Sequence, residues 1–281
     1  RSAAVITLRG TKYRDKFCLP LGPIPHLPLF TIRDTLIKMS DILTSVDNEV
    51  LTVTLNRADD GNAATDHMAI EITGIMNAAH EKARIVVLTG AGDTFCRGRA
   101  GHGRIPSASD EALDRRRNFD SIFDCYTSIR YCKIPVIAKL RGRAIGFGCS
   151  LASVTDLTIA ADDAIFQINE MDHNILPTMV LSSLIDRGSR KAINYMVYSA
   201  VEVPAERAIA YGLCSEIVPE AELDEAVDSL CKQMLKAPPI ATQGVKEYLN
   251  RAMTMDVPSA VDYARNLHAV FNASSEMRGK K

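Results

Sequence analysis

The sequence predicts an α/β protein built on a parallel sheet, with a helical region at its C-terminal end. Apolar strand patterns at residues 48–56 and 85–89 flank an amphipathic helical pattern, for which Asp66 is a suitable N-cap. A strand, a helix and a second strand in this order form the basic unit of a parallel sheet. Two glycine-rich loops follow two of the buried strands, where α/β proteins hold ligands. Helical patterns predominate after residue 178.

The composition is that of a globular protein with a sizeable core. The 281 residues are 47% hydrophobic and carry a formal net charge of -1. This balance favours neither nucleic acid nor an acidic membrane surface as a partner. No apolar run approaches the roughly 20 residues of a membrane span. The sequence therefore predicts a chain that binds neither nucleic acid nor membrane.

The cysteines and the start of the chain bear on its compartment. Seven cysteines are scattered without a C-x-x-C pair, which favours a reducing compartment such as the cytoplasm and offers no spacing suited to a metal. The chain begins with Arg1 rather than Met and has no recognisable secretory signal. We interpret it as a processed or trimmed product.

Three regions are expected. Residues 1–40 contain four prolines within residues 20–28 and predict an extended arm, which either packs on the body or a neighbouring subunit or forms a mobile leader. Residues 41–236 form the core domain, and residues 237–281 form a helical region.

Further elements are expected along the chain. A polar helix is predicted over residues 109–131, with an arginine run at 115–117 that faces solvent. Strands are predicted at 135–140, 156–160, 164–168 and 216–218, and helices at 178–187, 189–198, 204–211, 221–236, 239–255 and 258–272.

The second glycine-rich loop, within residues 139–153, leads from a buried strand into a helix of small residues. Gly142, Gly146 and Gly148 allow close approach of the backbone or a positive φ. The helix adds unpaired N–H groups and a positive dipole end, which together can hold a negative charge. Tight packing alone is the alternative explanation of these glycines.

Several motifs occur together in a defined order. They are VTLNR at 53–57, VVLTG at 86–90 with DTFCRG at 93–98, IPVIA at 134–138, GRAIGFGCSLA at 142–152, DLTIAA at 156–161 with Phe166, and AIAYGLCSEIV at 208–218. In this combination the chain, from about residue 47 to 255, resembles the crotonase superfamily, also called the enoyl-CoA hydratase/isomerase family.

The resemblance implies a fold and a chemistry. The fold is a spiral of β-β-α turns, with C-terminal helices that mediate homotrimers or hexamers. The substrate is an acyl-CoA thioester, and no cofactor is required beyond the CoA of the substrate itself. Two backbone N–H groups would hold the thioester oxygen, those of Arg99 after Gly98 and Phe147 between Gly146 and Gly148. Both residues are bulkier than is usual in the family, which would reshape the acyl pocket.

The resemblance also points to one carboxylate. Hydratases of the family have two glutamates, and this chain has Ser150 at the first position and Glu170 at the second. A single carboxylate can take a proton from one carbon and return it two carbons along, whereas hydration is easier with two. Glu170 is therefore the expected acid–base group of a double-bond isomerase. The alternative is a strand-end glutamate that only faces solvent.

Other residues near these positions each have two possible roles. Asp172 and His173 would assist binding or chemistry, or else cap a loop and lie at the surface, and His102 has the same alternatives. Ser150 would hold a water or substrate oxygen, or else pack or cap the helix. The candidates for the CoA phosphates are Arg57, Arg97, Lys246 and the arginines at 115–117.

Two features depart from the family. The loop at 99–102 lacks the usual acidic residue, and the C-terminus lacks the tail that closes over the ligand in many relatives. Hydration, decarboxylation, hydrolysis or C–C cleavage remain alternatives within the same enolate chemistry. A non-catalytic member that keeps the fold, with a pocket filled by Arg99, Phe147 and Ser150, is an alternative of another class.

Overall fold

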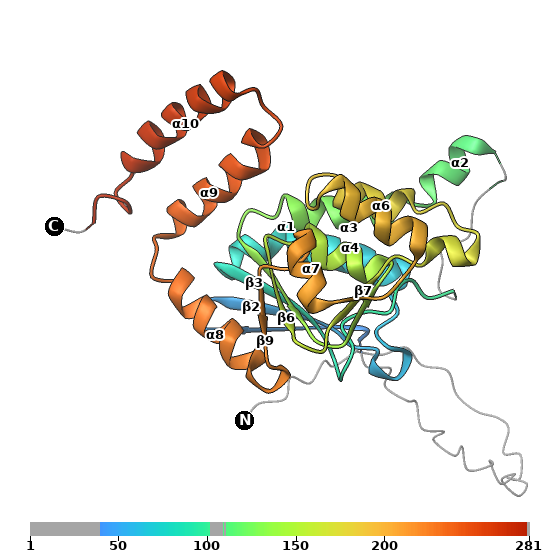
Figure 1. Ribbon diagram of the computed structural model, residues 1–281. Helices are drawn as coiled ribbons and strands as arrows, with labels where there is room; N and C mark the ends of the chain where they lie inside the picture. The colour runs from blue at the N-terminus through green and yellow to red at the C-terminus, as the bar shows by residue number, and fades with distance from the viewer. Residues whose placement is uncertain (1–39, 102–108, 110, 280–281) are drawn as a thin grey trace, which may run out of the picture. The chain divides into compact units, whose positions relative to one another are not determined.

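The computed structural model describes residues 40–101, 109 and 111–279 (Figure 1). Except for Ser40, the predicted N-terminal arm lies outside these ranges. The described residues form a mixed α/β fold with two sheets, which confirms the predicted class. None of the helices in these ranges has both the length and the apolar character needed to cross a membrane.

Six strands form the larger sheet, in the order β1-β2-β3-β4-β6-β9. They are β1 (Ile42–Asp47), β2 (Val50–Leu55), β3 (Ile85–Gly90), β4 (Val136–Leu140), β6 (Leu157–Ala161) and β9 (Glu216–Val218). β1 and β2 form an antiparallel hairpin, and the other pairings in this sheet are parallel, as the strand–helix–strand pattern predicts.

The hairpin shows that the predicted first strand, residues 48–56, is wrong at its start. Asn48 and Glu49 form the turn between β1 and β2, with φ values of 46° and 63°. Two positive φ values are typical of a two-residue hairpin turn, whose usual second residue is glycine. The Asn-Glu pair does not carry that signal, and the prediction therefore lacks β1.

The central strand β3 is buried on both faces. Val86 and Leu88 belong to the main core, together with residues of α1 (Asp66–Ala78) and α3 (Asp120–Arg130). Ile85 and Val87 belong to a second cluster with residues of α8 (Leu223–Met234). In Figure 1 the strands lie between α8 and the pair α1 and α3. Helices on both faces account for the continuous apolar run of this strand.

A smaller sheet contains β5 (Arg143–Ile145), β7 (Ile165–Gln167) and β8 (Val203–Pro204). β5 and β7 are parallel, and β8 pairs antiparallel to β7. β5 lies within the glycine-rich stretch and leads directly into α4 (Phe147–Val154). The chain after β7 enters a short 3-10 helix, Glu170–His173.

Two details of the predicted helices are wrong. The side chain of Thr65, not of Asp66, caps α1, since its Oγ1 accepts a hydrogen bond of 3.2 Å from the N–H of Met68. The predicted helix over 109–131 is two helices, α2 (Ala112–Arg117) and α3. The arginines at 115–117 are exposed, as expected.

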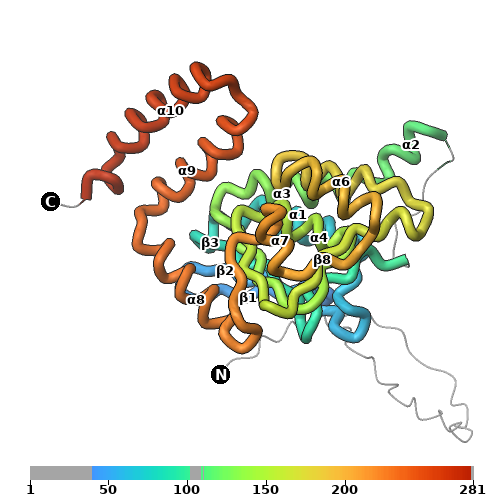
Figure 2. Tube along the Cα trace, viewed as in Figure 1, coloured from blue at the N-terminus to red at the C-terminus, as the bar shows by residue number. Residues whose placement is uncertain are grey.

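The remaining helices follow in the second half of the chain. They are α5 (Thr178–Leu184), α6 (Arg190–Ser199), α7 (Ala205–Tyr211), α9 (Pro239–Ala252) and α10 (Val257–Asn272). Figure 2 follows the chain from α8 through α9 into α10. The last two helices pack together through the rings of Tyr248 and Tyr263, whose centroids are 5.8 Å apart.

Candidate active site

Three turns meet at one edge of the smaller sheet. β5 and β7 are parallel neighbours, and Cys96 forms a parallel bridge with Ala144 of β5. The chain therefore leaves three adjacent parallel segments in the same direction, which is where α/β folds gather ligand-binding groups. These turns carry Arg99, Phe147 and Glu170, the three residues predicted to be catalytic.

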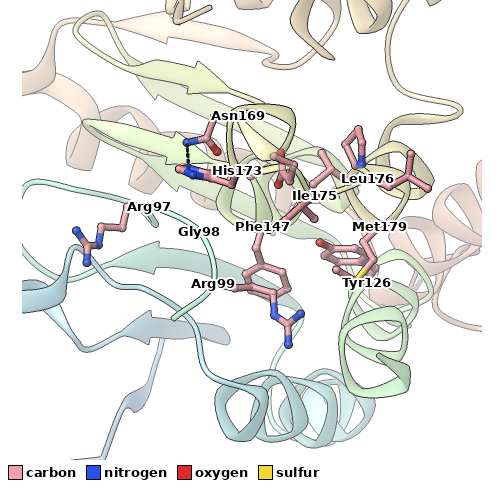
Figure 3. Close-up of a pocket in the computed structure, with 14 residues that line it drawn as sticks. Arg97, Gly98, Arg99, Tyr126, Phe147, Asn169, His173, Ile175, Leu176 and Met179 are labelled. Atoms are coloured by element: carbon pink, nitrogen blue, oxygen red, sulfur yellow. Dashed lines mark hydrogen bonds between the residues drawn. The ribbon is translucent and has the colours of Figure 1, made fainter. Parts of the chain in front are cut away.

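The three turns line a cavity of about 180 Å³ (Figure 3). The residues that line it are Arg97, Gly98, Arg99, Tyr126, Gly146, Phe147, Asn169, Glu170, His173, Ile175, Leu176, Pro177, Met179 and Val180. Figure 3 shows Arg97 at one end of this group and Tyr126, Leu176 and Met179 at the other. The cavity thus has a charged end and a largely apolar end.

Two backbone N–H groups at the cavity are available to a ligand. Phe147 is the first residue of α4, so its N–H has no partner within the helix. The two residues next to Arg99 in the chain are both bonded to Ala64. The Ala64 N–H donates to the Gly98 carbonyl at 2.9 Å, and the Ala100 N–H donates to the Ala64 carbonyl at 2.8 Å. Within the described ranges, neither the Arg99 nor the Phe147 N–H donates to a backbone carbonyl.

Glycines immediately before both donors set the direction of the chain. Gly98 has φ of 116°, and Gly146 has φ of 51° with ψ of -112°. Side chains with a Cβ rarely adopt these conformations. A Cβ on Gly146 would also lie 2.5 Å from Oε1 of Glu170. The glycine therefore allows the carboxyl group to lie directly against the turn that carries the Phe147 N–H.

The Glu170 carboxyl group is poorly solvated. Its Oε2 is buried and has no hydrogen-bond partner in the described part of the chain. Burial raises the pKa of the Glu170 carboxyl above its ordinary value, and its own backbone N–H and the nearby His173 partly offset this effect. A carboxyl group in such surroundings exchanges protons more readily near neutral pH than a solvated one.

The bulky side chains of the two N–H donors leave the cavity open. The guanidinium of Arg99 forms an ion pair with the buried Asp66 and lies 6.0 Å from the ring centroid of Phe119. The ring of Phe147 is stacked on that of Tyr126, with centroids 5.5 Å apart and planes at 27°. Both side chains are thus held by partners in the fold, and the cavity persists beside Glu170.

The remaining predicted site residues divide into two groups. Gly98, Gly146 and His173 line the cavity, and His173 Nε2 lies 3.5 Å from Asn169 Nδ2. Gly148, Ser150 and Asp172 do not line this cavity, and their contact with substrate stays a prediction.

Each of these three residues has its own surroundings. Gly148 packs against the backbone of Cys96, Ser150 is fully buried behind the lining, and Asp172 is exposed. His102 lies outside the described residues.

The candidates for binding phosphate also differ. Lys246 is wrong as a candidate, because its buried Nζ donates to Asp156 at 2.7 Å and to the carbonyl of Ile134 at 3.0 Å. Arg57 is held between Asp41 and Asp60. Arg97 lines the cavity with a side chain that is 58% exposed, although it pairs with Asp60.

Sequence reasoning missed two residues of the site. Tyr126 lies within the helix predicted over residues 109–131, where the sequence gives it no role in the site, and Asp66 is predicted only as a helix cap. Both roles depend on contacts between distant segments, α3 with α4 and α1 with the loop that carries Arg99. A polar ring tip within an apolar helical face was the only signal of Tyr126 in the sequence.

Comparison with known proteins identifies the family. The sequence matches the enoyl-CoA hydratase/isomerase family over residues 45–280. A probable enoyl-CoA hydratase of Rhodobacter capsulatus is 26% identical over 236 residues, which cover 83% of this chain and 90% of the relative. The human mitochondrial Delta(3,5)-Delta(2,4)-dienoyl-CoA isomerase is 28% identical over 238 residues, covering 79% and 71% of the two chains.

A solved structure gives the same result. The putative enoyl-CoA hydratase of Thermobifida fusca in complex with acetoacetyl-CoA superimposes with a TM-score of 0.73 at 28% identity, covering 82% of this chain and 94% of the other. The family match spans most of the sequence, and it includes the motifs, the residues that line the cavity and every strand except the start of β1. The chain belongs to the enoyl-CoA hydratase/isomerase family.

Proposed function

We propose that this protein is an acyl-CoA enzyme that shifts a carbon–carbon double bond through an enolate. The observation that carries the proposal is that two backbone N–H groups, which have no backbone acceptor among the described residues, and one poorly solvated carboxyl group lie at a single cavity. Relatives named as enoyl-CoA hydratases and as a dienoyl-CoA isomerase support acyl-CoA chemistry of this general kind.

The proposed reaction uses one carboxylate twice. Glu170 takes a proton from C2 of a 3-enoyl-CoA, and the electron pair moves onto the thioester oxygen to form an enolate. The N–H groups of Arg99 and Phe147 stabilise this charge, and one such donor contributes about 2.7–4 kcal/mol in other enzymes. Glu170 then returns the proton to C4, which leaves the double bond between C2 and C3. No water or second acid–base group is needed.

The single carboxylate is the reason to prefer isomerisation over hydration. Hydratases of the family have a glutamate at two positions. At the first of them this chain has the buried Ser150, which does not line the cavity. Hydration remains the second candidate, because a relative at 26% identity is named as a probable hydratase. Both reactions begin by building negative charge on the thioester oxygen.

The thioester would lie with its CoA portion toward the charged end of the cavity. Arg97 lies there, and an adjoining hollow of about 460 Å³ is lined by Arg97 and Arg143 among others. Arginine binds phosphate groups through paired N–H donors. We assign these two arginines, rather than Lys246, to the CoA phosphates.

Two assays test the proposal. The purified protein is incubated with 3-enoyl-CoA and, separately, with 2-enoyl-CoA, and α-proton exchange of a saturated acyl-CoA is followed in deuterated water. We expect isomerisation and exchange, with both reduced by at least about 100-fold in Glu170→Gln, because general acid–base catalysis contributes about 10²–10⁴-fold. Glu206→Gln, at an exposed glutamate of α7, is the control and should leave both unchanged.

The outcomes separate the candidates. Hydration of 2-enoyl-CoA without isomerisation of 3-enoyl-CoA would show the second candidate to be correct. Absence of exchange in the wild-type protein, or exchange that persists in Glu170→Gln, would contradict the catalytic assignment and favour a non-catalytic member of the family.

A further inference from the structure

Tyr126 lines the cavity, but the proposed reaction gives this residue no role. It lies on α3, is only 5% exposed and lines the cavity together with Glu170. Its ring is stacked on Phe147, the residue whose N–H is one of the two proposed donors. Figure 3 shows the tyrosine beside Met179 at the apolar end, away from Arg97. An acyl chain held at the two N–H groups would therefore run along this ring.

The Tyr126 hydroxyl stays neutral and is backed by a buried serine. Burial raises the pKa of the Tyr126 phenol far above its ordinary value, an effect that Ser150 opposes and Glu170 reinforces. The Ser150 Oγ is fully buried, and no described residue meets it in normal hydrogen-bond geometry. The Ser150 Oγ, which lies near the Tyr126 hydroxyl, thus has unused hydrogen-bonding capacity, which buried groups seldom keep without a purpose.

Other polar side chains around the cavity already have a partner or a proposed role. Arg99 pairs with Asp66, Arg97 is assigned to the CoA phosphates, and Asn169 lies beside His173. Glu170 is assigned to the proton transfer. Next to Tyr126 the described lining is apolar, with Ile175, Leu176, Pro177, Met179 and Val180, and the Tyr126 hydroxyl is the polar side-chain group that remains for a ligand.

We propose that Tyr126, supported by Ser150, selects acyl-CoA thioesters whose acyl chain carries a hydroxyl or carbonyl oxygen beyond the thioester. The inference rests on the proposed function, since it assumes that an acyl-CoA occupies the cavity. A site built to hydrogen-bond a substrate oxygen discriminates against an analogue that lacks the oxygen, because its own polar group is then buried without a partner. Tyr126 is a specificity-determining residue and takes no part in the proton transfer.

The size of the cavity restricts the acyl group as well. At about 180 Å³ it is smaller than the roughly 300–1,000 Å³ of pockets for drug-sized ligands. The rings of Tyr126 and Phe147, held against each other, occupy part of the space beside the two donors. The class of substrate is therefore a short acyl-CoA with an oxygen on its chain.

A binding experiment tests this without requiring turnover. The affinities of the full chain for butyryl-CoA, acetoacetyl-CoA and 4-hydroxybutyryl-CoA are measured by calorimetry, for the wild type, Tyr126→Phe and Ser150→Ala. We expect the wild type to prefer at least one oxygenated ligand over butyryl-CoA by roughly fivefold to tenfold, the worth of one net hydrogen bond. Tyr126→Phe keeps the stacked ring and should abolish this preference, with less than about a twofold change for butyryl-CoA.

Two further variants provide the controls. Tyr131→Phe, at an exposed tyrosine immediately after α3, removes a hydroxyl outside the cavity and should retain the preference. Ser150→Ala should reduce the preference in the same direction as Tyr126→Phe, and it provides the same test if Tyr126→Phe does not fold.

Each outcome has a distinct meaning. A wild type without the preference, or a preference that survives in Tyr126→Phe, overturns the assignment of Tyr126 and leaves the proposed function intact if α-proton exchange is present. A wild type that binds none of the three ligands contradicts both this inference and the proposed function.

Discussion

The buried surroundings of Glu170 disfavour the ionised form of its carboxyl group, although the proposed reaction begins with that form. Because burial raises the pKa of this carboxyl, the acidic limb of a kcat/KM profile should lie above the pKa of about 4.3 of an ordinary glutamate. Exchange or isomerisation rates between pH 4 and pH 8, on the order of one measurement per half unit, would locate the limb. A limb at the ordinary value would contradict the view that the cavity tunes this group.

The same burial predicts that Glu170 lowers the stability of the fold. A carboxyl whose pKa is raised in the native state binds more protons there than in the unfolded chain, so stability falls as pH rises through the interval between the two pKa values. Above that interval the cost is fully present. Glu170→Gln should therefore melt at a higher temperature than the wild type at pH 8, and the difference should vanish as the pH falls below the ordinary value. An unchanged difference across this range would contradict the explanation.

Individual site residues were predictable to the extent that their roles belong to the backbone or to one segment. The resemblance of the motifs to the family implies the roles of Arg99, Phe147 and Glu170, and the structure brings all three to one cavity. Tyr126 and Asp66 were missed because their neighbours come from distant segments. Lys246 was misassigned for the same reason, since nothing near it in the sequence indicates that its ammonium group would be buried and paired with Asp156.

At the scale of elements, α4, which carries the Phe147 N–H, is in close contact with the strand-like segment at Cys96, which leads to Arg99. A Cβ on Gly148 would lie 2.0 Å from the carbonyl oxygen of Cys96, so the helix would have to move away. We expect Gly148→Ala to destabilise the protein by about 1–3 kcal/mol in urea unfolding, the usual cost of overpacking. It should also reduce proton exchange, because the Phe147 N–H moves with the helix.

Gly74 provides the matched control for this substitution. It lies within α1, and a Cβ there would meet no atom within 4 Å. Gly74→Ala should therefore stabilise the protein by about 0.5–1 kcal/mol, as expected when a helical glycine becomes alanine. If both variants shift the unfolding midpoint in the same direction, the contact with Cys96 is not what requires glycine at position 148.

The elements themselves could be predicted where one local signal dominates. The strands β3 and β4 both begin with apolar runs, and both are predicted within a residue or two of their ends. The sequence did not predict the hairpin β1–β2 or the break between α2 and α3, because Asn48-Glu49 and Asn118-Phe119 contain neither glycine nor proline. Tertiary contacts decide the backbone at such places.

At the scale of the whole molecule, α9 is bonded to the core domain and packs against α10, and both helices have exposed apolar side chains. Lys246 of α9 is buried, and its ammonium group links this helix to Asp156 and the carbonyl of Ile134. In contrast, no residue of α10 is buried, and Val257 and Val270 are 75% and 68% exposed. Exposed apolar side chains gathered on two neighbouring helices favour association with another protein surface.

The expected partner is a further copy of this chain, because the resemblance to the family implies trimers mediated by C-terminal helices. Met253 is 73% exposed at the end of α9 and is a suitable probe of such a surface. We expect the wild type to sediment as a trimer or hexamer of the 30.7 kDa chain, and Met253→Lys to shift the population toward monomers, because association would bury the added charge. Ala221→Lys adds the same charge at another exposed position and should leave the assembly unchanged. A wild type that remains monomeric at micromolar concentration would leave the apolar face of α9 and α10 for a different partner.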